Sequence, residues 1–222
     1  MNVRLLVTGF SAFPGAPVNP SEVLVERLRR DAPGFDGVDL VTRVLPVAYQ
    51  SMPGLLGALG GEARPDIAIH FGLAETAKGF RLERIARNRS SLRAADAAGF
   101  VPRTPAIAVG GPRAARSSLP LDAIAERLRG LGLPVQTSDN AGAYLCNYLF
   151  YQSCTGGVDG FRPAMSGFVH VPFLDTQLAS IPPRRASRLA SLTEEELLRG
   201  AVAIMEICVA AAQATRCGGR SA

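Results

Sequence analysis

The chain has 222 residues, 47% of them apolar, and a formal net charge of +5. This length can bury one sizeable core, and we expect a single domain over residues 1–222. No run of about 18 uncharged apolar residues is present, which argues against a membrane-spanning helix and a membrane partner. The start of the chain passes directly into a strand-like stretch without the features of a leader, so we expect a cytoplasmic protein.

Arginine supplies almost all of the positive charge, because Lys78 is the only lysine. The densest cluster of arginines, between Arg81 and Arg93, alternates with apolar residues and contains Glu83. That pattern is typical of a solvated or ion-paired strand region rather than of a basic surface for nucleic acid. We therefore expect no nucleic-acid partner.

In chain order, the apolar patterns predict strand 4–8, helix 20–28, strand 38–44, helix 52–59, strand 67–71, strand 80–88, helix 121–131, strand 134–137, helix 144–153, strand 167–170 and a last helix over 193–212. Asn19 or Ser21 is a suitable cap for the first helix, and Thr193 with Glu196 fits a capping box for the last. Residues 90–117 read as one long loop of functional type. Strands that alternate with helices predict an α/β fold around a mainly parallel sheet.

The four cysteines show neither CxxC spacing nor a disulfide framework. Cys146 and Cys154 would lie about 12 Å apart along a helix, which is too far for a disulfide. Only His70 and His170 could supply imidazole, so we expect no metal site. Reduced thiols in a reducing compartment are the simplest interpretation.

The segment around Cys146 is the strongest candidate for chemistry. A strand leads into a small-residue turn, and Cys146 follows near the start of a helix, where unpaired N–H groups and the helix dipole favour negative charge. Such a position lowers the pKa of a thiol and can hold an oxyanion. The alternative is a buried structural cysteine, and this segment by itself favours that alternative.

A cysteine nucleophile needs a base, for which imidazole is the usual choice. His170 ends a predicted strand, where the sites of open α/β sheets gather, whereas His70 is better read as a satisfied core histidine. Glu83 could orient the imidazole as the third member of a triad. It could equally form a structural ion pair with Arg81 or Arg87, and the residues alone do not separate these two roles.

Four motifs in the same order resemble the pyroglutamyl peptidase I family, also called pyrrolidone-carboxylate peptidases. They are Thr8-Gly9-Phe10-x-x-Phe13-x-Gly15-x-x-x-Asn19-Pro20-Ser21, Glu83-Arg84-Ile85-Ala86-x-Asn88, Ala141-Gly142-x-Tyr144-x-Cys146-Asn147 and Gly167-Phe168-Val169-His170-Val171-Pro172. The similarity runs from the first strand to the last helix. It implies a three-layer α/β/α sandwich around a mainly parallel, mixed sheet, an enzyme without a cofactor, and assembly as a homotetramer.

The resemblance also implies the reaction, which is removal of an N-terminal pyroglutamyl (5-oxoprolyl) residue from a peptide through a thioester acyl-enzyme. By motif, Cys146 attacks the carbonyl, His170 transfers the proton and Glu83 orients His170. Arg93 and the backbone N–H of Cys146 would stabilise the oxyanion. The substrate-binding residues would be Phe10, Phe13, Asn19, Leu73 and Tyr144, where the family often has phenylalanine in place of the tyrosine. Aromatic walls suit a flat, neutral lactam, although Phe10 and Phe13 could also be ordinary core residues.

One segment departs from the family pattern. Where the family typically has a Gly-Gly-Arg turn, this chain has Ala74-Glu75-Thr76-Ala77. Loss of two glycines predicts a different loop path beside the proposed pocket. A non-catalytic or substrate-shifted relative that binds pyroglutamyl peptides is therefore the second hypothesis. A nucleoside-phosphorylase-like enzyme is the third, and it ranks last because no glycine-rich phosphate loop of the Walker type is present.

Overall fold

The structure, a computed structural model, describes residues 2–31 and 34–218. At its centre is one mixed sheet whose strands pair in the order β2 (Val38–Leu45), β1 (Val3–Phe10), β3 (Ile67–Leu73), β8 (Met165–Val171), β4 (Phe80–Glu83) and β7 (Val135–Ser138). The first four of these strands are parallel. Strand β4 runs antiparallel to β8 and parallel to β7, so the predicted mainly parallel, mixed sheet is confirmed.

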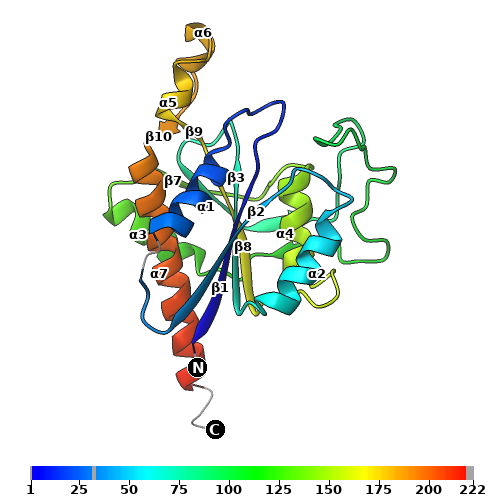
Figure 1. Cartoon of the computed structure of the whole chain (residues 1–222), viewed down its shortest axis with the longest axis vertical. Helices are drawn as coiled ribbons and strands as arrows, with labels where there is room; N and C mark the ends of the chain where they lie inside the picture. Colours follow the sequence, from blue (N-terminus) through cyan, green and yellow to red (C-terminus); the bar gives the residue numbers. More distant parts are fainter. Residues whose placement is uncertain (1, 32–33, 219–222) are drawn as a thin grey trace.

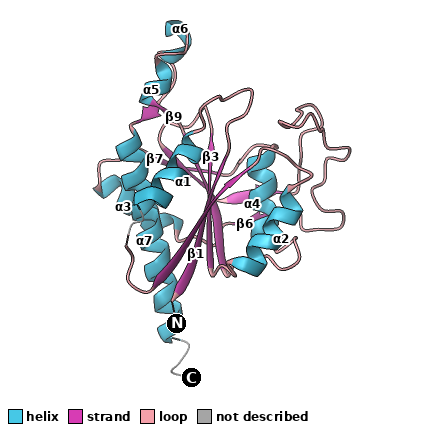
Figure 2. Cartoon of the chain, in the orientation of Figure 1, coloured by secondary structure: helices cyan, strands magenta, loops and turns pink. Residues whose placement is uncertain are grey.

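Helices cover both faces of this sheet, as Figures 1 and 2 show. One face carries α1 (Pro20–Asp31), α3 (Leu121–Gly130) and α7 (Glu194–Gly218), and the other carries α2 (Met52–Glu62) and α4 (Leu145–Thr155). Each layer of helices buries its own apolar cluster against the sheet. The predicted three-layer α/β/α sandwich is therefore confirmed.

Alternation along the strands decides which side chains meet under α2 and α4. Successive side chains of a strand point to opposite faces of a sheet. Phe168 packs in the apolar cluster beneath α4, so His170, two residues further on, lies on the same face. By the same period, Gly72 of β3 lies on the face of Ala68, which also belongs to that cluster. His170 and Gly72 therefore share the face of the sheet that α4 covers.

The single strand predicted over residues 80–88 is wrong. It divides at Arg84 into β4 and β5 (Ile85–Arg87), and β5 pairs with β6 (Ala114–Arg116) in a separate two-stranded sheet. The backbone N–H of Arg84 donates to Ser138 O in the central sheet (2.7 Å), whereas its carbonyl accepts from Ser117 N (2.9 Å). The N–H of Arg84 thus hydrogen-bonds into the central sheet, whereas its carbonyl bonds to the residue that follows β6. The chain therefore bends at Arg84.

A second unpredicted part projects from the body of the molecule (Figures 1 and 2). It follows β8 and contains the short elements β9 (Phe173–Leu174), α5 (Asp175–Leu178), α6 (Pro183–Ala186) and β10 (Ser191–Leu192). Strands β9 and β10 pair in parallel at its base. We call residues 173–192 the projecting arm.

Helix α7 begins at a capping box, as predicted, because Thr193 Oγ1 accepts from Glu196 N (3.1 Å) while Glu196 Oε2 accepts from Thr193 N (2.9 Å). Residues 194–216 are long and apolar enough to match a membrane-crossing helix by length and composition, a test that core helices also pass. Ala201, Ile204 and Cys208 are fully buried in the core between α7 and the sheet. Helix α7 is thus partly buried core.

Candidate active site

The turn before α4 presents Cys146 at the second helical position. Gly142 adopts a φ of +83°, which favours glycine, and the helix then starts after Tyr144 in extended conformation. No side chain caps this helix start. The N–H groups of its first turn, including that of Cys146, therefore have no partner within the helix and remain available to an oxyanion.

The thiol of Cys146 lies directly over Gly72 of β3. A Cβ atom added to Gly72 would be 3.1 Å from Cys146 Sγ and 2.8 Å from the ring of Phe168. Gly72 is also the parallel pairing partner of His170 on β8. Glycine at position 72 thus leaves room for the sulfur to approach the sheet. This point of β3 lies next to β8, the strand that carries His170, the predicted base.

His170 and Glu83 form a buried acid–base pair. His170 Nδ1 lies 2.7 Å from Glu83 Oε1, and their side chains are 4% and 0% exposed. A carboxylate at this distance holds the ring proton on Nδ1, which leaves Nε2 as the acceptor. Burial acts to raise the pKa of Glu83, but the hydrogen bond and charge of His170, with Arg81, outweigh it and hold that pKa below its ordinary value.

The resting thiol is protonated, contrary to the expectation from helix position. Enclosure by protein raises the pKa of the half-buried Cys146 to about 12, and the charge of Glu83 acts in the same direction. Arg81 and the residue's own N–H lower the pKa by less than these two effects raise it. Desolvation of the thiolate therefore exceeds the gain from the helix start, and a base must remove the proton during reaction.

Arg81 completes the cluster of charges around the imidazole. It is the cross-strand partner of His170 in the antiparallel pair β4–β8. Its Nε donates to Glu83 Oε1 (2.8 Å), and its Nη2 lies 3.2 Å from His170 Nδ1. Glu83 thus contacts both His170 and Arg81, so the two roles considered for this carboxylate coexist in one group.

The five residues predicted to bind substrate all line one small cavity, which also reaches Cys146. The cavity measures about 60 Å³ and is lined by Phe10, Phe13, Asn19, Val47, Leu73, Tyr144, Leu145 and Cys146. Val47 and Leu145 carried no signal in the sequence beyond being apolar. Asn19 caps the start of α1, because its Oδ1 accepts from Ser21 N (3.1 Å). Its Nδ2 donates to Ser11 O (3.1 Å).

The loop over residues 90–117 packs against the start of α4 but leaves Arg93 exposed. Tyr144 Oη donates to Ala95 O (2.9 Å), and Ser91 N donates to Ala143 O (2.6 Å). Within the described part of the chain, the guanidinium of Arg93 has no hydrogen-bond or ion-pair partner. The structure therefore shows no polar contact between Arg93 and the triad residues among the described residues, and the oxyanion role of Arg93 stays a prediction.

Asn147 joins the two halves of the site and was not predicted as a functional residue. This fully buried side chain accepts from Arg87 N (2.9 Å) and donates to Arg87 O and Arg89 O, both at 2.8 Å. It thereby fastens the start of α4 to the segment that follows Glu83. The only sequence signal was its place directly after Cys146 in the quoted motif.

His70 is a satisfied core histidine, as predicted. Its Nδ1 lies 2.7 Å from Thr8 Oγ1 and its Nε2 lies 2.9 Å from Ser153 Oγ, which in turn contacts Ser166 Oγ at 2.5 Å. Complete burial lowers the pKa of His70 to about 3, so the ring is neutral. Ser153 is seven residues after Cys146, and the network therefore holds the same face of α4 against the sheet.

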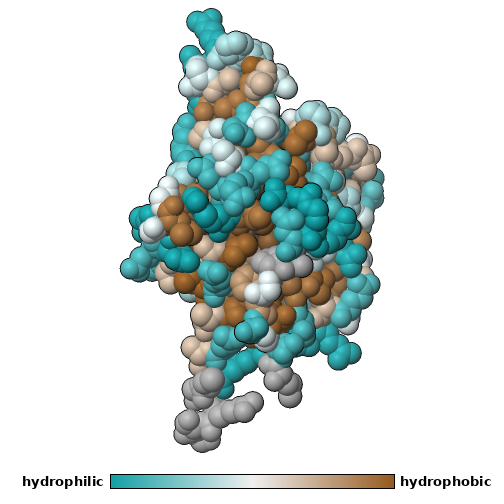
Figure 3. Space-filling view, turned by 60° about the vertical axis from the view of Figure 1, so that its left-hand side comes forward, coloured by the Kyte–Doolittle hydropathy of each residue, from teal (hydrophilic) through white to brown (hydrophobic). Residues whose placement is uncertain are grey.

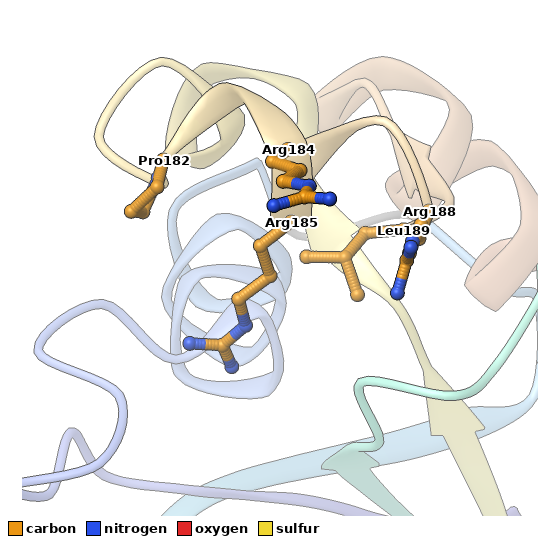
Figure 4. A pocket seen from close by; sticks show the side chains of 5 residues that line it. All are labelled: Pro182, Arg184, Arg185, Arg188 and Leu189. Carbon is orange, nitrogen blue, oxygen red and sulfur yellow. The ribbon is translucent and has the colours of Figure 1, made fainter.

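Other features lie away from this site. A hollow of about 660 Å³ on the projecting arm is lined by Pro182, Arg184, Arg185, Arg188 and Leu189, none of which contacts the residues described above as the site (Figure 4). Residues 2–31 and 34–218 contain no group of three or more metal-ligating side chains. Cys154 and Cys208 are unpaired thiols with raised pKa values caused by burial, and the side chain of Cys217 lies outside the described residues.

A thiol over the strand next to that of a carboxylate-bound imidazole, on an α/β/α sandwich, supplies the chemical groups of a cysteine hydrolase. Comparisons with known proteins agree. The family model described as pyroglutamyl peptidase matches residues 3–212. The pyrrolidone-carboxylate peptidase 1 of Ralstonia nicotianae is 40% identical over 80% of this chain and 82% of its own length, and the enzyme of Pyrococcus furiosus is 38% identical over 79% and 84%.

Solved structures give the same result. The pyrrolidone carboxyl peptidase of Fervidobacterium islandicum has a TM-score of 0.85 at 35% identity, covering 92% of this chain and 97% of its own. A variant from Pyrococcus furiosus has a TM-score of 0.84 at 34% identity, with the same coverage. The chain therefore belongs to the pyroglutamyl peptidase family and is a cysteine peptidase of the pyroglutamyl-peptidase I type.

Proposed function

We propose that Cys146, His170 and Glu83 act as nucleophile, base and orienting acid in the hydrolysis of the amide bond after an N-terminal pyroglutamyl residue. The observation that carries this assignment is the 2.7 Å contact between His170 Nδ1 and Glu83 Oε1. His170 pairs across the sheet with Gly72, and the sulfur of Cys146 lies over Gly72. The departure at residues 74–77 leaves these three residues in place, so hydrolysis rather than binding alone is the favoured function.

In the proposed mechanism, His170 Nε2 takes the proton of Cys146 as the sulfur attacks the pyroglutamyl carbonyl carbon. The C=O electron pair moves onto oxygen, and the N–H of Cys146 at the helix start stabilises the resulting oxyanion, assisted by Arg93. When the tetrahedral intermediate collapses, the imidazolium gives its proton to the leaving amine and a thioester remains. Water, deprotonated by His170, attacks the thioester, and pyroglutamate and the free thiol are released.

Glu83 keeps the imidazole in the tautomer that this mechanism requires. Its carboxylate accepts the Nδ1 proton of His170 and stabilises the imidazolium that forms in each half-reaction. Because the thiol is protonated at rest, the barrier includes the transfer of its proton, and a correctly oriented base lowers that barrier.

The cavity favours a small uncharged ring. It is small, at about 60 Å³, and most of the side chains that line it are apolar. Phe10, Phe13 and Tyr144 offer aromatic faces, and no charged side chain lines the cavity. A pyroglutamyl lactam is flat and carries no ammonium group, which matches such a lining.

The test uses a fluorogenic pyroglutamyl amide, with the corresponding prolyl and leucyl amides as substrate controls. Wild-type protein should release the fluorophore from the pyroglutamyl amide alone, and Cys146→Ala and Cys146→Ser should lose essentially all of that activity. Cys154→Ser, which removes another half-buried thiol from the same helix, is the matched control and should stay active. Full activity of Cys146→Ala would rule out the assignment of the nucleophile.

We also propose that the chain works in the cytoplasm as a homo-oligomer, with the homotetramer as the expected state. The projecting arm and the loop 15–18 enclose a groove of about 450 Å³ that includes Val18, Phe173 and Ile181, and Val18 is 44% exposed. Figure 3 shows apolar surface among hydrophilic residues on this projecting end. Light scattering coupled to gel filtration would give the mass of the assembly, and a monomeric mass would contradict the proposal.

A further inference from the structure

Arg81 is the one cation in contact with the acid–base pair among the described residues. Its Nε–Glu83 Oε1 distance of 2.8 Å and its Nη2–His170 Nδ1 distance of 3.2 Å bring it to both members. The side chain is only 15% exposed, so solvent screens these interactions weakly. Arg81 does not line the substrate cavity, which separates its influence from substrate contact.

Arg81 is held in place by the loop that departs from the family pattern. Its Nη1 donates to Thr76 Oγ1 (3.1 Å), and Thr76 lies in the segment Ala74-Glu75-Thr76-Ala77. The next residue, Ala77, is fully buried, and Glu75 forms an ion pair with Arg185 of the projecting arm at 2.7 Å. The loop is therefore anchored on both sides of Thr76.

We propose that Arg81 is a positioning residue for the catalytic pair: it fixes the Glu83 carboxylate against His170 and disfavours the protonated imidazole in the resting enzyme, and Thr76 holds it there. This inference rests on the proposed roles of Cys146, His170 and Glu83. Its consequence is that the neutral base persists to lower pH than a histidine–carboxylate pair alone would allow, because a pair without the cation attracts a proton more strongly.

The charges that face His170 support this sign. Strand β4 contributes Glu83 and Arg81, α4 contributes the uncharged thiol of Cys146, and the neighbouring position on β3 is Gly72. Burial lowers the pKa of His170, Glu83 acts to raise it, and Arg81 acts to lower it. Removal of the Arg81 charge leaves burial alone to oppose Glu83, so the pKa of His170 rises and the base is lost by protonation at a higher pH.

The experiment compares pH profiles of kcat/KM for the pyroglutamyl amide in Arg81→Met, Arg81→Lys, Thr76→Val and the control Arg84→Met. Arg84 is the adjacent arginine on the other side of Glu83, but it is exposed and pairs with Asp139. For Arg81→Met, the ratio of kcat/KM at pH 5.5 to that at pH 8.0 should fall by about threefold or more, as the acidic limb moves to higher pH. Arg84→Met should superimpose on wild type.

The other variants separate charge from packing. Arg81→Lys keeps the cation, so its acidic limb should remain near that of wild type even if kcat falls, whereas Thr76→Val should shift the limb in the same direction as Arg81→Met but less. The loss should appear in kcat rather than in KM. If Arg81→Met does not fold, Arg81→Lys and Thr76→Val still test the proposal through the same limb.

A readout without substrate distinguishes failure of this inference from failure of the proposed function. The pH dependence of iodoacetamide alkylation of Cys146, after subtraction of the Cys146→Ser background, should show the same displacement in Arg81→Met. If the alkylation profiles of Arg81→Met and wild type coincide while Cys146→Ala is inactive, the role proposed for Arg81 is wrong and the proposed function stands. Activity of Cys146→Ala would instead overturn the proposed function itself.

Discussion

The α4 face of the sheet holds two buried histidine clusters with opposite properties. Among the described residues, the hydrogen-bond partners of His70, in the middle of β3, are hydroxyl groups, whereas His170, near the end of β8, contacts the charges of Glu83 and Arg81. Both rings are buried and both have lowered pKa values, since burial disfavours the imidazolium. Only His170 has a carboxylate that stabilises a transferred proton. Burial with neutral partners thus suits a structural histidine, and burial with a paired anion suits the base proposed for His170.

The largest expected effect comes from removing that anion. Glu83→Gln keeps the shape of the side chain but cannot stabilise an imidazolium, and its amide can hold the ring in the wrong tautomer. We expect kcat/KM to fall roughly 10²- to 10⁴-fold. Glu62→Gln, at an exposed ion pair between α2 and Arg43, is the matched control and should keep wild-type activity. Near-normal turnover by Glu83→Gln would remove the distinction between the two clusters.

A second prediction tests the distance between the base and the thiol. In Gly72→Ala the new Cβ would lie 2.8 Å from the Phe168 ring and 3.1 Å from Cys146 Sγ, so the ring or the sulfur must move. We expect kcat to fall on the order of 10- to 100-fold, since small misplacements of reacting atoms are costly. Gly61→Ala on α2, where an added Cβ meets no atom within 4 Å, should retain full activity. Steady-state kinetics on both variants decides the matter.

The third and smallest effect concerns the stability of the fold rather than turnover. The folded-state pKa of His70 is about 3, well below the ordinary value of 6.5. The unfolded chain therefore binds the extra proton, and the stability that His70 contributes is complete above pH 6.5 and lost as the pH falls toward 3. The loss is about 1.4 kcal/mol per pH unit within that window, or about 2 kcal/mol between pH 7 and pH 5.

His70→Gln removes the titration while keeping polar partners for Thr8 and Ser153. Urea unfolding at pH 7 and pH 5 should therefore show a loss that is smaller by about 2 kcal/mol in this variant than in wild type. The acidic limb of its activity profile should match that of wild type, because His70 does not touch the site. An activity limb that moves with His70→Gln would mean that the two clusters are coupled.

Much of the fold followed from local patterns. Short strand-like runs marked five of the six strands of the sheet correctly in position and type, and the capping box marked the start of α7. The break at Arg84 was missed because its cause is a pairing with residues 114–116, which are distant in the sequence. The projecting arm was missed because its elements are two to four residues long, too short for a periodic signal.

At the site, residue type and position made Cys146, His170 and Glu83 candidates but left structural roles open for Cys146 and Glu83, and the resemblance to the family decided in favour of the triad. The sequence also indicated aromatic walls for a small pocket. No role could be assigned to Gly72 or Asn147 from the sequence. The need for glycine at position 72 depends on which atom packs against it, and the role of the Asn147 amide depends on which backbone groups it hydrogen-bonds.

What the sequence by itself determined was therefore the family and the layered fold, and it supplied the candidates for the reactive groups, because these depend on local periodicity and on residue types in fixed order. Tertiary structure alone decided the state of those groups. The thiol of Cys146 is protonated at rest and Arg81 faces His170 because desolvation and charge act through space, between strands that the sheet brings together from distant parts of the chain.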